Sequence, residues 1–314
     1  MQAWPGVAPL PSPAVLIVGN LVEQRTRLWQ IALLALPLAV FGLIVVWPLA
    51  SSFYYSFTNW NGFGAGYDFV GFDNFAQILG DRLFFNAIVN TVIWMIAAII
   101  LPSGLGLILA LLLDSRVPGA SIFKTIFYLP ICLSAVIVGQ IWIWIYQPDW
   151  GLLNTLIGAA TGEDANFAWL AKPGTALYSV IVAWSWQQTG LSMVIFLAGL
   201  TAVPSDLLEV SDIEGANTFQ RIWHVVLPLL RPATVVVIAL SVINSLKGFD
   251  ILYIMTGGGP FNSSDTLAMH MYNESFKKYL MGYGAAISVV LFLIAITIIF
   301  FYFRQLKKVD EIYD

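Results

Sequence analysis

The chain has 314 residues, of which 59% are hydrophobic and 10% are charged, and its mean hydropathy is +0.82. Soluble globular domains carry roughly 25% charged residues, so this composition excludes an ordinary soluble protein and predicts one that lies in a bilayer. The 14 basic and 18 acidic residues give a net charge of −4, which excludes binding to nucleic acid or anionic lipid through bulk charge. The single cysteine, Cys132, excludes an internal disulfide and any multi-cysteine zinc or iron–sulfur site.

Six apolar stretches are long enough to be membrane-spanning helices, because about 20 residues cross roughly 30 Å of hydrocarbon. A β-barrel would instead have strands of about 10 residues with alternating hydrophobicity, and continuous runs such as VLFLIAITIIFFYF do not alternate. The predicted fold is therefore an all-α integral membrane protein with six transmembrane helices. The predicted spans are residues 29–53, 86–113, 123–146, 176–200, 229–255 and 282–303.

Basic residues near the span ends predict the orientation through the positive-inside rule. With the N-terminus in the cytoplasm, nine of them lie on the inner side and four on the outer side. Both termini are therefore expected in the cytoplasm. The inner set is Arg25, Arg27, Arg116, Lys124, Arg221, Arg231, Arg304, Lys307 and Lys308, and the outer set is Arg82, Lys172, Lys277 and Lys278.

The segments outside the spans predict one membrane domain with two tails. Residues 1–28 contain four prolines and no basic residue ahead of a short apolar patch, unlike the positively charged start of a cleavable signal peptide. We expect a flexible cytoplasmic tail over 1–28, a transmembrane domain over 29–305 and a cytoplasmic C-terminal tail over 306–314.

Residue patterns for catalysis are missing from the sequence. The two histidines, His224 and His270, are expected on opposite sides of the membrane and so cannot share a site. The sequence contains no HExxH for zinc, no GxSxG for a serine nucleophile and no GxxxxGK[ST] for a nucleotide phosphate. An enzyme is therefore not predicted, and any nucleotide must bind another chain.

The connection over 204–228, between the fourth and fifth spans, is the most structured of the expected cytoplasmic connections. Ser205 is predicted to cap a first helix, and Gly215 to end it in the left-handed conformation. Asn217 is predicted to cap a second helix that continues to Val226, before Pro228. Such a short amphipathic pair lies on the membrane surface or docks into a partner. The acidic side chains of this pair are Asp206, Glu209, Asp212 and Glu214.

This connection resembles the EAA loop of ATP-binding-cassette (ABC) importer permeases. Glu209, Gly215 and the Leu227-Pro228 pair have the spacing of that motif without a gap. Val210, Ser211 and Val225 stand where the family usually has two alanines and an isoleucine. Residues 197–200 (LAGL), Pro204 and residues 249–260 (FDILYIMTGGGP) resemble carbohydrate-importer permeases of the maltose type. The likeness covers roughly residues 29–305.

The resemblance implies a type I importer permease fold and a transport mechanism. In such permeases the loop is a coupling helix in a cleft of an ATPase subunit, so that closure of two ATPases moves two permeases between inward-open and outward-open states. It implies a second permease, two ATPase subunits and an extracytoplasmic solute-binding protein as partners, in a bacterial or archaeal inner membrane. ATP and magnesium would bind the ATPases, and no cofactor would bind this chain. The residues assigned to ATPase coupling are Glu209, Asp212, Glu214, Gly215, Ala216, Leu227 and Pro228.

Polar residues inside the fifth predicted span need an explanation, because a charge at the bilayer centre costs about 2.5–3.5 kcal/mol. Asn244, Lys247 and Asp250 recur at three-residue spacing on one helical face. An ion pair between Lys247 and Asp250, or snorkelling, would satisfy the charges without function. A water-filled cavity lined by these side chains is the favoured interpretation. The resemblance implies that this stretch, with Phe249, contacts substrate.

The fourth span carries Trp184, Gln187 and Gln188 in an apolar helix, and the third span carries Gln140. A tryptophan ring stacks on the apolar face of a sugar, and side-chain amides hold its hydroxyls. The predicted function is therefore transport of a di- or oligosaccharide or a glycoside. A glycerol phosphate-type ester is the alternative substrate, and an ion-gradient-driven secondary transporter or channel is the alternative class.

Overall fold

The computed structural model describes residues 33–64, 66–114, 119–246 and 248–310, and it confirms the predicted all-α fold. Over these residues the sole β contact is an isolated antiparallel bridge between Thr58 and Phe69. The chain divides into two compact units at Tyr54. The predicted tail over 1–28 lies outside the described residues.

The first unit is described as one apolar helix. It begins at Leu33, passes through the π-helical segment η1 (Gly42–Val46) and ends with α2 (Trp47–Tyr55). It is 23 residues long and apolar, which is sufficient for a membrane span. The described part agrees with the first predicted span, 29–53.

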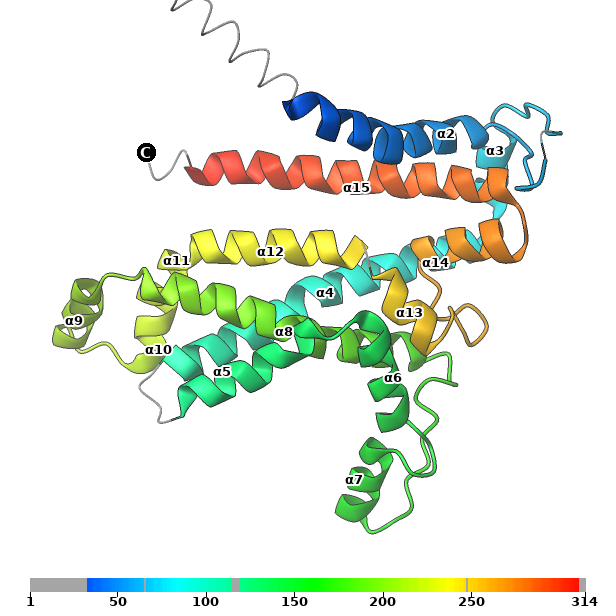
Figure 1. The fold of residues 1–314 in the computed structure, drawn as a ribbon. Coiled ribbons are helices and arrows are strands. Elements are labelled where there is room, and N and C mark those ends of the chain that lie inside the picture. The colour runs from blue at the N-terminus through cyan, green and yellow to red at the C-terminus, as the bar shows by residue number, and fades with distance from the viewer. Residues whose placement is uncertain (1–32, 65, 115–118, 247, 311–314) are drawn as a thin grey trace, which may run out of the picture. The chain divides into compact units, whose positions relative to one another are not determined.

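Three long helices of the second unit confirm three further predicted spans (Figure 1). They are uninterrupted because their sequences are apolar and nearly free of charge over more than 18 residues. They are α4 (Arg82–Asp114), α8 (Ala176–Thr201) and α15 (Met281–Asp310), whose apolar part is Met281–Tyr302.

The third and fifth predicted spans correspond to helix pairs that are bent. α5 (Ala120–Tyr128) and η2 (Leu129–Cys132) make an angle of 105° with α6 (Ala135–Ile145). Leu133 is extended and Ser134 accepts a hydrogen bond from the Ile137 N–H, which starts a new helix. The second bend, of 70°, separates Thr218–Leu229 from α12 (Arg231–Leu246). The described residues thus hold four candidate spans, or six if each bent pair makes one.

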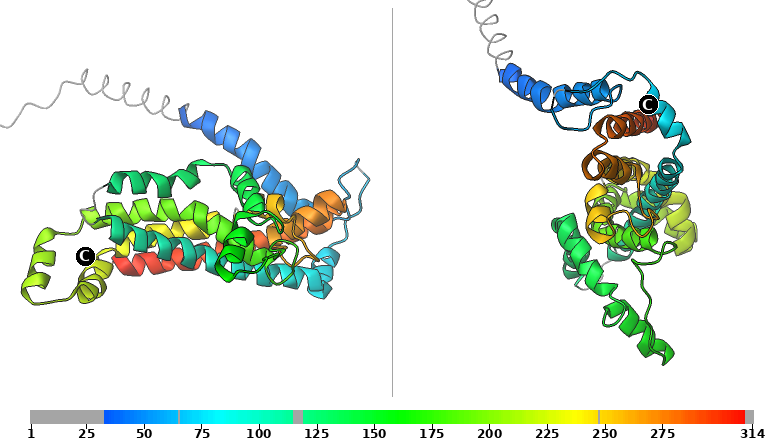
Figure 2. Two further views of the ribbon diagram at one scale, coloured as in Figure 1. Left: turned by 90° about the horizontal axis from the view of Figure 1, so that it is seen from below. Right: turned by 90° about the vertical axis from the view of Figure 1, so that its right-hand side faces the viewer.

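Shorter helices connect the spans at both ends of the second unit (Figure 2). α9, α10 and α11 gather at one end, whereas α6, α13 and α14 lie toward the other (Figure 1). The connecting elements are α3 (Asp73–Gly80), α7 (Leu152–Thr161), α9 (Ser205–Ile213), α10 (Thr218–Arg221), η3 (Ile222–Val226), α11 (Leu227–Leu229), α13 (Phe249–Met255), α14 (Leu267–Tyr272) and η4 (Asn273–Lys277).

The core of the second unit consists of three clusters along its length. One lies beneath α9–α11 and contains Met193 and Phe196 of α8. The middle cluster joins Trp94 of α4 to Trp184 of α8, and a third surrounds Tyr283 of α15. These clusters fix α4 and α8 side by side and so position the elements that end on them.

Candidate functional site

The connection between α8 and α12 is anchored to the core at its base. Val226 and Leu230 are buried in the cluster that also holds Phe196 and Leu200 of α8. The second helix continues to Leu229 and does not end before Pro228 as predicted. Pro228 lies in α11, directly after the π-helical segment η3 and two residues before the helix bends.

The turn between the two short helices confirms the predicted roles of Gly215 and Asn217. Gly215 has φ of +78°, and the Ala216 N–H donates to the Ser211 carbonyl at 3.0 Å. Asn217 and Gln220 form a reciprocal capping box in which each side chain accepts from the other's main-chain N–H at 2.9 Å. This hydrogen bonding gives the turn a defined shape.

The predicted cap by Ser205 is wrong. Pro204 occupies the cap position of α9, and Ser205 is the first helical residue. Its hydroxyl lies 3.4 Å from Oδ1 of Asp206 and does not cap the helix. Pro204, fixed at φ of −61°, starts the helix by its backbone shape instead.

The surface of this connection combines acidic and apolar side chains. Glu209, Asp212 and Glu214 are exposed, and Asp212 accepts a hydrogen bond at 3.0 Å from Arg221 of α10. Ile213 is 84% exposed and Phe219 is 72% exposed, although both are apolar. Exposed apolar groups next to charges are typical of a protein-binding surface. Ala216, Leu227 and Pro228, also predicted for coupling, are half-buried behind this surface.

A second feature is a cavity of about 300 Å³ between α8, α12, α13 and the bend before α6. It brings together five of the residues predicted for a substrate path, although they come from three helices. Three of the five side chains are amides, one is a carboxylate and one is an indole. Its lining residues are Ile131, Ala135, Trp184, Gln187, Gln188, Asn244, Gly248, Asp250 and Ile251.

Hydrogen bonds hold the amides of this cavity in place. The Gln187 Nε2 donates to the Leu133 carbonyl at 2.8 Å, at the break before α6. The Asn244 Nδ2 donates to Oε1 of Gln188 at 3.4 Å, which joins α12 to α8. Gln187 is 5% exposed, while Asp250 is exposed to the open side. The cavity therefore has a fixed polar wall and an accessible carboxylate.

The predicted continuous helix through Asn244 and Asp250 is interrupted. α12 ends at Leu246 and α13 begins at Phe249, so the two side chains come from different helices. Gly248 lies against the ring of Trp94, and a Cβ there would be 2.6 Å from Trp94 Cζ2. The Trp94 Nε1 also donates to the Ser245 carbonyl at 3.0 Å. α4 therefore contacts the chain closely at the position where α12 ends and α13 begins.

Two of the predicted substrate-path residues do not line this cavity, and a third lies outside the described residues. Phe249 lines a small neighbouring cavity with Trp94 and Leu252. Gln140 is exposed on α6, away from the lining residues. Lys247 lies outside the described residues, and with it the predicted Lys247–Asp250 pair.

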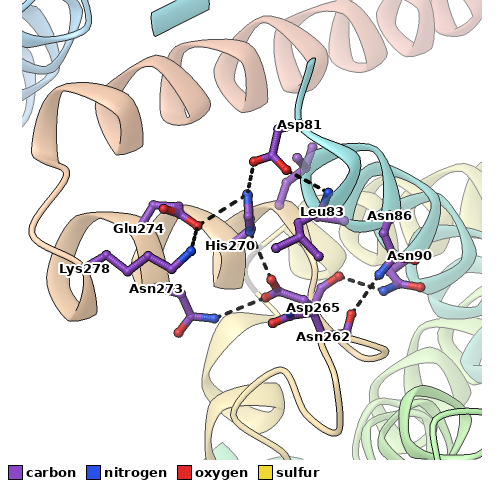
Figure 3. Close-up of polar contacts among 12 residues, drawn as sticks. Asp81, Leu83, Asn86, Asn90, Asn262, Asp265, His270, Asn273, Glu274 and Lys278 are labelled. Atoms are coloured by element: carbon purple, nitrogen blue, oxygen red, sulfur yellow. Dashed lines mark hydrogen bonds and ion pairs between the residues drawn. The ribbon is translucent and has the colours of Figure 1, made fainter. Parts of the chain in front are cut away.

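A buried charged cluster at the opposite end from α9 was not predicted (Figure 3). Nδ1 of His270 lies 3.1 Å from Oδ2 of Asp265, and its Nε2 lies 3.5 Å from Oδ2 of Asp81. Oε1 of Glu274 lies 2.6 Å from the ammonium of Lys278 and 4.0 Å from Nε2 of His270. His270, Asp265 and Glu274 are each at most 3% exposed.

The electrostatics of this cluster favour a protonated imidazole. Burial lowers the pKa of His270, but the hydrogen bond to Asp265 and the charges of Asp265, Glu274 and Asp81 outweigh it and raise the pKa above the ordinary value of 6.5. Asp81 is far from the others in sequence, so no local pattern indicates the cluster. It connects the start of α4 to α14 and η4.

The chain is similar to known transport proteins over most of its length. A sequence profile of the family described as "Binding-protein-dependent transport system inner membrane component" matches residues 103–308. The chain is 33% identical over 290 residues to a probable starch degradation products transport system permease protein of Thermoanaerobacterium thermosulfurigenes, covering 91% of this chain and 97% of that one. It is 31% identical over 265 residues to an sn-glycerol-3-phosphate transport system permease protein of Agrobacterium fabrum, covering 83% and 89%.

The fold is similar to that of a solved transporter chain. A bacterial ABC transporter involved in the import of the acidic polysaccharide alginate contains a chain with a TM-score of 0.78 and 20% identity. The match covers 92% of this chain and 99% of the solved one. At this identity the likeness establishes the fold.

Proposed function

Since the chain is an ABC importer permease that belongs to the family of binding-protein-dependent transport system inner membrane components, we propose that it carries a di- or oligosaccharide or a glycoside. As a permease, it is not itself the catalyst of ATP hydrolysis. It would form the path with a second permease and receive substrate from a solute-binding protein. Two ATPase subunits would bind ATP and magnesium on the cytoplasmic side, where both termini of this chain would also lie.

The side chains that line the cavity favour a sugar as the substrate. Trp184 offers an indole for the apolar face of a sugar ring, and three amides with a carboxylate offer hydrogen bonds to hydroxyl groups. The volume of about 300 Å³ lies at the lower end of small-ligand sites, which suits one sugar ring at a time. A second permease would close the open side.

A phosphate ester fits this cavity less well. Asp250 lines it and would repel a phosphate, and the lining residues within the described part of the chain include no lysine or arginine. The glycerol phosphate-type substrate is therefore the second candidate. Family membership in a binding-protein-dependent system disfavours an ion-gradient-driven transporter or channel.

We also propose that the connection Ser205–Leu229 is the coupling element that docks into an ATPase subunit. Its exposed acids suit basic or polar groups of the partner, and Ile213 and Phe219 suit an apolar cleft. The Gly215 turn and the capping box make it rigid. A rigid element transmits the movement of the ATPase, whereas a flexible loop would absorb it.

The test is sugar uptake by the complete transporter in liposomes, with ATP inside and its binding protein outside. The substrates are maltose, diacetylchitobiose and glycerol 3-phosphate. We expect Gln188→Ala to lower sugar uptake about tenfold, because one or two hydrogen bonds are lost. Gln140→Ala, outside the cavity, is the matched control and should transport normally. Uptake of glycerol 3-phosphate alone would contradict a sugar substrate.

A further inference from the structure

Four aromatic side chains of α13, α14 and η4 form a continuous series of ring contacts. The ring of Phe249 stacks on Tyr253 with centroids 5.5 Å apart and lies 5.1 Å from Tyr272. Tyr272 lies 5.3 Å from Tyr253 and 5.3 Å from Phe276. We name Phe249, Tyr253, Tyr272 and Phe276 the aromatic strip.

The aromatic strip lies next to the proposed sugar cavity, because Phe249 lines the small neighbouring cavity and the following residue, Asp250, lines the sugar cavity. Asp250, which lines the cavity, lies between Phe249 and Tyr253 on the exposed side of α13. The other side of α13 is buried through Ile251 and Leu252. From Tyr253 the strip passes to α14 and η4, at the end of the unit opposite α9 (Figure 1). It therefore leads from the cavity toward the end that would face the outside.

The strip is not simply part of the core. Tyr253 is 40% exposed and Phe276 is 52% exposed, so much ring surface stays open. The Lys277 ammonium lies 5.9 Å from the ring centroids of both Tyr253 and Tyr272. An exposed group of contacting rings with a cation over two of them and a carboxylate next to it in the same helix differs from the isolated rings of an interfacial belt.

We propose that the aromatic strip is an outer binding site for a carbohydrate ring, occupied before the ring reaches the cavity. Open aromatic faces stack on the C–H face of a pyranose ring, while the hydroxyls of Tyr253 and Tyr272 and the Lys277 ammonium bond to sugar hydroxyls. Asp250 then receives the ring at the inner end. This inference rests on the proposed sugar transport.

The experiment compares variants of the complete transporter in liposomes, with its binding protein and maltose or diacetylchitobiose as the sugar. Uptake and ATP hydrolysis are measured together. We expect Tyr253→Ala with Phe276→Ala to lower sugar uptake about tenfold, because two stacking surfaces are lost. ATP hydrolysis stimulated by the binding protein should stay near normal, so fewer sugars enter for each ATP.

Two controls isolate the stacking surface. Tyr253→Phe keeps the ring and should stay within about threefold of normal uptake, since only a hydroxyl is lost. Phe261→Ala removes an outer aromatic side chain that is 91% exposed and outside the strip, and should have no effect.

Other results would overturn the proposal. If the double alanine variant takes up sugar as fast as the unmodified transporter, the aromatic strip is not a sugar-binding site. The proposed sugar transport would be unaffected by this result. Loss of the second permease during purification would make the strip a subunit interface. A complete unmodified transporter that takes up no sugar would overturn the proposed function together with this site.

Discussion

At the residue scale, His270 has an unusual environment for a histidine at the end of a membrane helix bundle. It faces Asp81 from the start of α4, Asp265 from the loop before α14, and Glu274, which Lys278 also contacts. Tyr283 of α15 donates to Asp81 at 2.7 Å. A protonated imidazole offsets the carboxylates, so His270 strengthens the connection between these segments while it carries its proton.

The first prediction is a stabilising contribution of His270 that disappears at alkaline pH. The pKa of His270 is higher in the folded chain than the ordinary 6.5 of the unfolded chain. Its contribution is therefore complete below that value and is lost as the pH rises through the folded-state pKa. His270→Gln should cost about 3–5 kcal/mol at about pH 6, since the buried carboxylates lose their partner. The measurement is the melting temperature of the purified transporter between about pH 6 and pH 9.

The second histidine of the chain supplies the control. His224 is exposed in η3, so His224→Gln should change the melting temperature little at any pH. A constant difference between His270→Gln and the unmodified chain across the pH range would contradict a protonated His270.

At the scale of elements, local signals were predictable from the sequence, whereas bends were not. Gly215 and Asn217 were assigned correctly because a left-handed glycine and a capping box depend on neighbouring residues alone. The break between α12 and α13 depends on Trp94, which approaches Gly248 from another helix. Ser205 was misassigned because Pro204 can start a helix without a side-chain cap.

The second prediction concerns the turn at Gly215. Proline has φ near −65°, which is incompatible with the observed +78°, so Gly215→Pro should open the turn and misplace α10. We expect sugar uptake to fall below about 10% of normal, with the chain still inserted in the membrane. The measurements are uptake in liposomes and the yield of ATPase subunits that co-purify.

Asparagine is the matched substitution at this position, because it tolerates positive φ better than other residues that carry a side chain. Gly215→Asn should keep most of the uptake. Normal uptake by Gly215→Pro would show that the shape of this turn does not matter for coupling.

At the scale of the whole molecule, the cavity depends on how three helices meet. The sequence indicated which side chains are polar inside the spans, and five of them gather in one cavity. It did not indicate that Gln140 points elsewhere, because a helix that turns by 105° at residues 133–134 changes the direction of everything after it. The positions of polar residues within the spans can be read from the sequence. Which of them meet in one cavity depends on how the helices pack, and the sequence alone does not indicate it.

The last prediction separates the cavity from the coupling element. Asp250 belongs to α13, which lies toward the end of the unit opposite α9, α10 and α11 (Figure 1), so changes at Asp250 should leave ATPase binding intact. Asp250→Asn keeps the shape and removes the charge, which weakens hydrogen bonds to hydroxyls. We expect sugar uptake to fall about tenfold with unchanged co-purification of the ATPase.

The reversed charge tests the choice between the two substrate classes. Asp250→Lys replaces the carboxylate of the cavity by a cation, and the other described lining residues carry no charge, so uptake of glycerol 3-phosphate should rise relative to sugar. The measurement is the ratio of the two uptake rates at equal substrate concentration. A ratio equal to that of the unmodified transporter would place Asp250 outside the path, because a charge at the path must act differently on an anion and on a neutral sugar.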